Sequence, residues 1–340
     1  MGVLQIIYYT EILAHNPYIE RAIPCWLLGF PYSPAIYSIS VVIIIAVVFW
    51  LILLQTRSLA NTRKLLKERD QDIYLIANQK YALEQKDKDM TDSLVYAQRI
   101  QEALLPSELY FRRHFKDAFI FFHPKDIVSG DFYWIGSKGD RVFVVAADCT
   151  GHGVPGALMS MIGLNIIEKT INEANIETPS KILGVLNISL EQTFSREKNI
   201  GTIIRDGMDI SLCVIDKKRK KLEYAGAFLP LYHIRNNSLH EIKPDKLIIG
   251  MNPDGTEYIN HEIDLMEDDI FYLFSDGYAD QFGGTENKKF MYRRFRYLLL
   301  TIHKFPVEDQ KAILEENFRT WIGRNEQVDD ILVIGFKPLG

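Results

Sequence analysis

The sequence is poor in the features that mark nucleic-acid-binding, zinc-binding and disulfide-rich proteins. It has no excess of positive charge, since 39 Lys and Arg stand against 44 Asp and Glu, for a formal net charge of −5. No basic patch with interleaved aromatic residues occurs, which argues against nucleic acid as a partner. The three cysteines, Cys25, Cys149 and Cys213, have no spacing typical of a metal site or a disulfide framework. We interpret them as incidental residues in a mostly reducing compartment.

Charge is also missing from one long stretch, residues 35–54, which reads AIYSISVVIIIAVVFWLILL. A helix of this length spans about 30 Å, the thickness of the hydrocarbon core of a bilayer. Tyr37 and Trp50 lie near its ends, where interfacial aromatic residues are common. A buried core helix is the alternative, but such helices are rarely apolar on every face. We predict one transmembrane helix.

The charges beside this stretch predict its orientation. Arg57, Arg63, Lys64, Lys67 and Arg69 follow it, whereas Arg21 is the only basic residue before it. Because positive charge is retained on the cytoplasmic side, we expect a single-pass protein of the cell (inner) membrane with residues 55–340 in the cytoplasm. Residues 1–34 would then form a short extracytoplasmic or interfacial segment, too short to bury a core of its own.

Residues 55–105 carry a seven-residue repeat. Apolar residues recur in two series offset by three positions, and no Gly or Pro interrupts the segment: Leu59, Leu66 and Ile73, then Ile76, Leu83, Met90, Ala97 and Leu104. This pattern predicts a parallel coiled-coil signalling linker, and therefore a homodimer. Lys80 and Asp87 place charge at two seam positions, so the coiled coil would be weak in its middle. A single amphipathic helix lying on its own domain is the alternative.

Residues 106–340 have a different pattern of apolar residues. Apolar runs that predict strands occur at residues 117–123, 132–136, 141–148, 209–216, 221–227, 231–235, 270–275 and 331–337. Helical patterns are fewer and cover about residues 154–173, 179–197 and 306–323. Many strands with a few long helices, without regular alternation of the two, predict an α+β layered domain.

Aspartates recur at the edges of these apolar strands: Asp131, Asp148, Asp276, Asp329 and Asp330. Each has an alternative interpretation as an ordinary turn residue. Strand ends of one layered domain can converge, however, and converging carboxylates repel one another unless a cation lies between them. Oxygen ligands favour Mg²⁺ or Mn²⁺ over Zn²⁺. Two such ions can activate water and hold a phosphate group.

The ordered motifs DIVSGDFYW, ADCTGHGVPGALMS, DGMDISLCVID, YLFSDGYAD and DDILVIGF resemble those of the bacterial PPM-type (type-2C-like) serine/threonine phosphatases, in the SpoIIE/RsbU branch. The segment YAQRIQEALLP (residues 96–106) is similar to the one that commonly precedes this domain, and the resemblance covers about residues 94–338. It implies a β-sandwich flanked by helices and two Mn²⁺ or Mg²⁺ ions. It also implies hydrolysis of phosphoserine or phosphothreonine on a protein by a water molecule that bridges the ions.

The resemblance also implies roles for single residues. Asp148 would be the bridging metal ligand, and the backbone carbonyl of Cys149 would complete the shell of one ion. Asp276 would be the second main carboxylate. Asp329 matches the late metal-binding aspartate of the family, and Asp330 is the adjacent candidate.

For three further residues the role stays open between two alternatives. Asp131 would act on a metal-bound water or as an outer ligand. His152 would either donate a proton to the leaving serine oxygen or only pack and cap its turn, because it follows Asp148 by four positions where the eukaryotic enzymes have a shorter spacing. Asp209 would bind a third ion or serve as a turn or strand-start residue.

Three alternatives to a phosphatase were considered. A catalytically inert PPM-fold module for signalling or scaffolding would be expected to lack a core aspartate, and none is missing here. A nucleotide cyclase would need an acidic residue that the SGDFY segment does not have. A sensor histidine kinase would need an asparagine-rich ATP-binding box and glycine-rich lid motifs. The branch typically acts on a phosphorylated regulatory protein, an anti-sigma-factor antagonist, and this substrate is implied by the resemblance alone.

Overall fold

The computed structural model describes residues 34–195, 206–252 and 256–339. The predicted N-terminal segment of residues 1–34 therefore lies outside the described residues, apart from the backbone of Pro34. The described chain divides into two parts, one ending at Gln85 and one beginning at Lys86. Each part is described by itself.

The first part belongs to helix α2 (Pro34–Leu104). The helix runs without a break because no Gly or Pro occurs between Pro34 and its end at Leu104, and interior Gly and Pro are the residues that weaken or end helices. From Ser38 to Gln85 its side chains are exposed, including the apolar ones of the uncharged stretch. Within the described residues it is the one helix long and apolar enough to cross a membrane. The predicted long apolar helix is confirmed, while the coiled coil stays a prediction.

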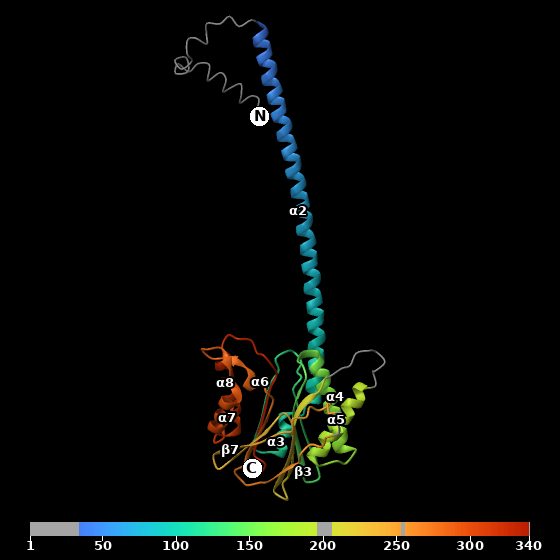
Figure 1. Ribbon diagram of the computed structural model, residues 1–340, viewed down its shortest axis with the longest axis vertical. Helices are drawn as coiled ribbons and strands as arrows, with labels where there is room; N and C mark the ends of the chain where they lie inside the picture. Colours follow the sequence, from blue (N-terminus) through green and yellow to red (C-terminus); the bar gives the residue numbers. More distant parts are fainter. Residues whose placement is uncertain (1–33, 196–205, 253–255, 340) are drawn as a thin grey trace. The chain divides into compact units, whose positions relative to one another are not determined.

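The second part contains two five-stranded antiparallel sheets (Figure 1). One has the order β1-β12-β9-β6-β7, with bounds Ala118–His123, Ile331–Phe336, Ile270–Phe274, Leu231–Arg235 and Ser238–Ile242. The other has the order β2-β3-β4-β5-β8, with bounds Phe132–Lys138, Arg141–Cys149, Met208–Asp216, Lys221–Ala227 and His261–Asp264. A short hairpin joins β10 (Phe282–Gly283) to β11 (Lys288–Lys289).

Helices cover the outer face of each sheet, so the layers run helix, sheet, sheet, helix (Figure 1). One side carries α4 (Gly153–Asn172) and α5 (Pro179–Ser195), and the other carries α7 (Met291–Ile302) and α8 (Val307–Ile322). The short helices are α3 (Glu108–His114) and α6 (Gly277–Asp280). The predicted α+β layered sandwich flanked by helices is confirmed.

Alternation along the strands builds this arrangement. In β3, Val142 and Val144 belong to the core between the two sheets, whereas Phe143 and Val145 belong to the core beneath α4 and α5. Since successive strand residues point to opposite faces, a strand buried on both faces is an unbroken apolar run. In β12 the side chains alternate in the same way between the central core and the core beneath α7 and α8. An unbroken apolar run in this sequence therefore identifies a strand that is buried on both faces.

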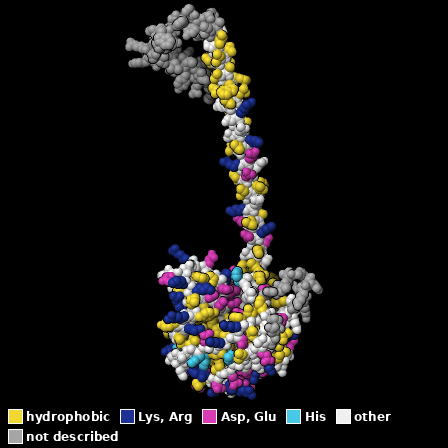
Figure 2. All heavy atoms as spheres, viewed as in Figure 1, with side chains coloured by type: hydrophobic (Ala, Val, Ile, Leu, Met, Phe, Trp, Pro, Cys, Tyr) yellow, Lys and Arg dark blue, Asp and Glu magenta, His cyan; other side chains and the backbone are white. Residues whose placement is uncertain are grey.

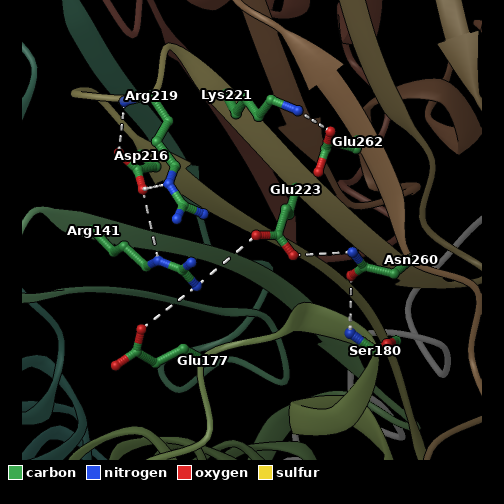
Figure 3. A network of polar contacts seen from close by, with 9 residues as sticks. All are labelled: Arg141, Glu177, Ser180, Asp216, Arg219, Lys221, Glu223, Asn260 and Glu262. Carbon is green, nitrogen blue, oxygen red and sulfur yellow. Dashed lines mark hydrogen bonds and ion pairs between the residues drawn. The ribbon is translucent and has the colours of Figure 1, made fainter.

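An ion-pair network fixes the connection between α4 and α5 to the sheet (Figure 3). Arg141 of β3 lies between acidic side chains, with Glu177 at 3.5 Å and both Asp216 and Glu223 at 3.9 Å. The amide of Asn260 donates to Glu223 at 3.0 Å. One arginine thus ties the interhelical connection to β4 and β5.

Candidate metal centre

The predicted aspartates gather at one edge of the sandwich, with contributions from both sheets. Asp148 lies near the end of β3 and Asp131 directly precedes the antiparallel neighbour β2. In the other sheet, Asp276 follows β9, and Asp329 and Asp330 directly precede its antiparallel neighbour β12. Antiparallel pairing puts the end of one strand beside the start of the next, which is why distant positions meet here.

A hydrogen bond between the two sheets confirms that these edges adjoin. The hydroxyl of Ser275 donates to Oδ2 of Asp131 at 2.5 Å and accepts the backbone N–H of Leu332 at 3.0 Å. Asp131 is 1% exposed, so this charge-capable group lies in the protein interior. Ser275 therefore holds the Asp131 carboxyl beside the start of the Asp276 loop.

Asp148 faces three other acidic groups. Asp209 is its direct cross-strand partner on β4, and like charges placed opposite each other destabilise a sheet. Burial raises the pKa of Asp148 well above its ordinary value, and the charges of Asp276, Asp329 and Asp209 raise it further. The arrangement is unfavourable for a carboxylate unless positive charge is supplied.

The remaining acids of the cluster show the same effect. Burial, followed by the charge of Asp148, raises the pKa of Asp131 well above its usual range. Burial raises the pKa of Asp276 to about 6, with a further contribution from Asp329, and raises that of Asp209 to about 6, with a contribution from Asp276. Burial also raises the pKa of Asp329. Mutually raised pKa values are typical of functional sites.

Asp329 and Asp330 make different contacts although they are adjacent. Asp330 is 2% exposed and accepts the backbone N–H groups of Lys125 at 2.7 Å and Gly130 at 2.8 Å. The carboxylate of Asp329 accepts one hydrogen bond within the described residues, from the backbone N–H of Asp330 at 2.9 Å, and Asp329 stays partly exposed. The carboxylate of Asp330 thus holds the loop before Asp131, and Asp329 keeps oxygen capacity for a ligand.

The donor chemistry fits a hard divalent cation. Oδ1 of Asp276 is buried with no hydrogen-bond partner in the described part of the chain, and such an oxygen requires an explanation. Over the same residues, no three His, Cys, Asp or Glu side chains are already close enough to hold an ion by themselves. Oxygen donors, excess negative charge and an orphaned buried oxygen together favour Mg²⁺ or Mn²⁺.

The loop after Asp148 is shaped by close backbone approaches. A Cβ atom on Gly130 would lie 2.6 Å from the carbonyl oxygen of Gly151, and one on Gly156 would lie 2.2 Å from the same oxygen. Only glycine allows these approaches, so the Gly130 loop and the start of α4 both pack on the Gly151 turn. Cys149 is 2% exposed, and burial raises the pKa of its thiol well above the ordinary value. The role of its backbone carbonyl as a metal ligand stays a prediction.

His152 has a partner that the sequence pattern did not single out. Its Nδ1 lies 2.7 Å from Oδ2 of Asp126, and both side chains are about half exposed. His152 occupies the N-cap position of α4, but its side chain makes no capping hydrogen bond. Burial raises the pKa of Asp329, and the nearby His152 is among the groups that oppose this rise. The imidazole is therefore oriented by a carboxylate near the acidic cluster.

Gln101 of α2 is a second residue that sequence reasoning missed. It is 4% exposed, and its amide donates to the carbonyl of Ser129 at 2.6 Å and to Oγ of Ser160 at 2.9 Å. Its Oε1 accepts the N–H of Ser129 at 3.0 Å. The last turn of α2 is thus bonded both to the Asp131 loop and to α4. In the sequence, the signal for this role was a polar glutamine at a seam position of the heptad repeat.

Comparison with known proteins identifies the family. The family model described as stage II sporulation protein E (SpoIIE) matches residues 138–338, and the chain belongs to this family. The phosphoserine phosphatase RsbU of Bacillus subtilis (strain 168) is 28% identical over 159 residues, which are 46% of this chain and 44% of RsbU. The chain thus matches less than half the length of this curated relative.

Solved structures agree with the fold. The SiaA-PP2C domain of Pseudomonas aeruginosa is 32% identical, with a TM-score of 0.68, and the match covers 74% of this chain and 98% of that one. The PP2C phosphatase domain of SpoIIE from Bacillus subtilis, solved with a fragment of its regulatory domain, has a TM-score of 0.51 and 16% identity, covering 65% and 62%. The resemblance of the motifs to the SpoIIE/RsbU branch is confirmed.

Proposed function

We propose that this protein is a membrane-anchored, metal-dependent protein serine/threonine phosphatase. The observation that carries the proposal is the cluster of buried and half-buried carboxylates contributed by both sheets, with the unpartnered Oδ1 of Asp276 in it. Membership of the SpoIIE family and the likeness to RsbU, which is named a phosphoserine phosphatase, support the same activity.

In this proposal Asp148, Asp276, Asp329 and the carbonyl of Cys149 hold two Mn²⁺ or Mg²⁺ ions. When bound, the ions would supply an activated water and charge neutralisation for a phosphate ester. Asp131, kept in place by Ser275, would accept a proton from water at the site. Asp330 would act as a positioning residue through the loop it holds, in place of the ligand role considered for it.

His152 would donate a proton to the departing serine or threonine oxygen. An alkoxide is a poor leaving group, so protonation in the transition state accelerates its release. Asp126 supports this role because its carboxylate lies 2.7 Å from Nδ1 and orients the ring. The alternative of a capping histidine has less support, since the side chain makes no capping hydrogen bond.

The substrate would be a phosphorylated regulatory protein, such as an anti-sigma-factor antagonist, and nucleic acid would not be a partner. The span of residues 35–54, a cytoplasmic catalytic domain and a homodimer through residues 55–105 belong to the same proposal. Labelling of single cysteines in intact cells would test the topology. Reagent access from outside to positions after Arg57 would contradict the proposed orientation.

A catalytically inert scaffold is the alternative function. The test is hydrolysis of p-nitrophenyl phosphate and of a phosphoserine protein by the full-length chain in detergent, with Mn²⁺ or with a chelator. We expect turnover of both substrates that requires the metal. No turnover with either ion would favour the scaffold, and metal-independent turnover would contradict the proposed metal dependence.

A further inference from the structure

A groove beside α7 is not used by the proposed chemistry. It has a volume of about 1150 Å³. We define the α7 groove by Met291, Tyr292, Arg293, Arg296 and Tyr297 of α7 and by Trp321 of α8. The groove lies within the folded domain and is built from described residues alone.

The charge of the α7 groove has one sign. Arg293, Arg294 and Arg296 line it, and no acidic residue does. Figure 2 shows Lys and Arg side chains gathered with apolar ones on this side of the domain, where Figure 1 places α7 and α8. This face would attract an acidic segment, and a phosphate group beside it, before contact.

The arginines differ in how firmly they are held. Arg294 stacks on Trp321, with its guanidinium carbon 4.7 Å from the ring centroid. Arg296 donates to the hydroxyl of Tyr232 at 2.9 Å and pairs with Glu241 at 2.5 Å. Arg293 is exposed and has no ion pair within the described residues. Arg293 is therefore the arginine with charge available for a ligand.

The α7 groove also exposes apolar surface and a strained residue. Tyr297 is 75% exposed, on the side of α7 opposite the buried Phe295 and Leu299, and Met291, at the start of the helix, is 55% exposed. Met291 has a φ of 72°, a left-handed conformation that is unfavourable for a residue with a Cβ atom. Such strain concentrates at functional sites, and exposed aromatic and Met side chains are typical of protein-binding surfaces.

One end of the α7 groove adjoins the carboxylate cluster. The ring of Tyr292 lies 6.3 Å from that of Phe274, which is two residues before Asp276. The charge of Asp276 also acts on the Tyr292 hydroxyl and, with burial as the larger cause, raises the pKa of that group. Lys289, just before α7, pairs with Asp280 of α6 at 2.7 Å. The start of α7 is therefore packed against the strand and helix that flank Asp276.

We propose that the α7 groove binds the segment flanking the phosphorylated residue of the protein substrate, and that this segment carries acidic and apolar side chains. Arg293 would pair with an acidic side chain, while Met291 and Tyr297 would contact an apolar one. The inference rests on the proposed function, because that function supplies a protein substrate. Charge complementarity and continuity with the carboxylate cluster select this occupant over a second copy of the chain.

The test uses full-length protein in detergent with Mn²⁺ and two fluorescent peptides of equal length in their dephosphorylated, serine form. One peptide has Glu and Leu flanking the serine, and the other has Lys in place of Glu. We expect the wild type to bind the Glu peptide about five-fold more tightly, the size expected of one exposed ion pair. Arg293→Glu should remove or reverse this preference. Arg113→Glu, the same charge change on an exposed residue of α3, should leave it intact.

Hydrolysis of p-nitrophenyl phosphate, which has no flanking chain, separates the two proposals. Arg293→Glu should retain this turnover while kcat/KM for the phosphorylated Glu peptide falls about five-fold. If aryl phosphate is hydrolysed but Arg293→Glu and Arg113→Glu bind the peptides alike, the groove proposal is wrong and the function stands. If the peptide preference appears without any turnover, the function is wrong and the groove proposal stands. Loss of an oligomer in Arg293→Glu with unchanged peptide binding would make the groove an interface between copies and overturn the proposal.

Discussion

The adjacent aspartates before β12 offer a matched pair of substitutions. Asp330→Asn removes the charge from a buried carboxylate that accepts two backbone N–H groups at 2.7 and 2.8 Å. The amide can still accept one of these bonds, but its NH₂ group faces the other donor. Hydrogen bonds to charged groups contribute about 1.5–3 kcal/mol each, so we expect the free energy of unfolding to fall by about 2–3 kcal/mol. That is a large part of the stability of an ordinary domain.

Asp329→Asn should behave in the opposite way. Its carboxylate has one local backbone partner and lies among other acids, so removing its charge relieves repulsion in the absence of metal. We expect unchanged or higher stability without divalent ions, together with loss of Mn²⁺-dependent turnover. The assay is urea unfolding of the full-length protein in a chelator, followed by near-UV circular dichroism. If Asp329→Asn lost more stability than Asp330→Asn, the assignment of one as ligand and the other as loop anchor would be refuted.

The other predictions concern pH, the end of α2 and proton donation. Without divalent ions, stability should fall as pH rises from about 4 through about 6. The reason is that the raised pKa values of Asp276 and Asp209 let the native state hold protons that the unfolded chain releases. Urea midpoints at about pH 5 and pH 7 measure this change, and equal midpoints would contradict it. Gln101→Ala should lower both stability and Mn²⁺-dependent turnover, whereas Glu102→Ala, on the exposed side of the same turn, should change neither. An active and stable Gln101→Ala variant would exclude a link from α2 to the site. His152→Gln should reduce kcat for phosphoserine much more than for p-nitrophenyl phosphate, whose leaving group needs little protonation; equal losses for both substrates would remove His152 as the proton donor.

The strands with mostly buried side chains, among them the edge strands β1 and β2, and three helices were predictable from sequence because burial leaves apolar runs. All eight predicted strand runs occur, as do the helices at α4, α5 and α8. Strands β7 and β8 were missed, since both are sheet edges with polar, largely exposed side chains. Helix α7 was also missed, because its buried face is narrow and three arginines interrupt its apolar residues.

The candidate site was predictable as a set of residue types but not in its internal contacts. Strand-edge aspartates identified the cluster, and pairing of β2 with β3 and of β9 with β12 explains why they meet. Nothing in the DDILV motif distinguishes Asp329 from Asp330, because the difference lies in which backbone N–H groups each one meets. The partner of His152 was equally hidden, since Asp126 is 26 positions away and reaches it only through the fold.

Binding of Mn²⁺ measured by titration calorimetry, with turnover of a phosphoserine protein measured on the same samples, tests the central claim most directly. Wild-type protein should bind two ions and hydrolyse the substrate only when they are present. Asp148→Asn and Asp276→Asn should keep the fold, judged by near-UV circular dichroism, and lose both Mn²⁺ binding and turnover. Undiminished Mn²⁺ binding or near wild-type turnover in Asp148→Asn would contradict the assignment of this cluster as the metal centre of a phosphatase.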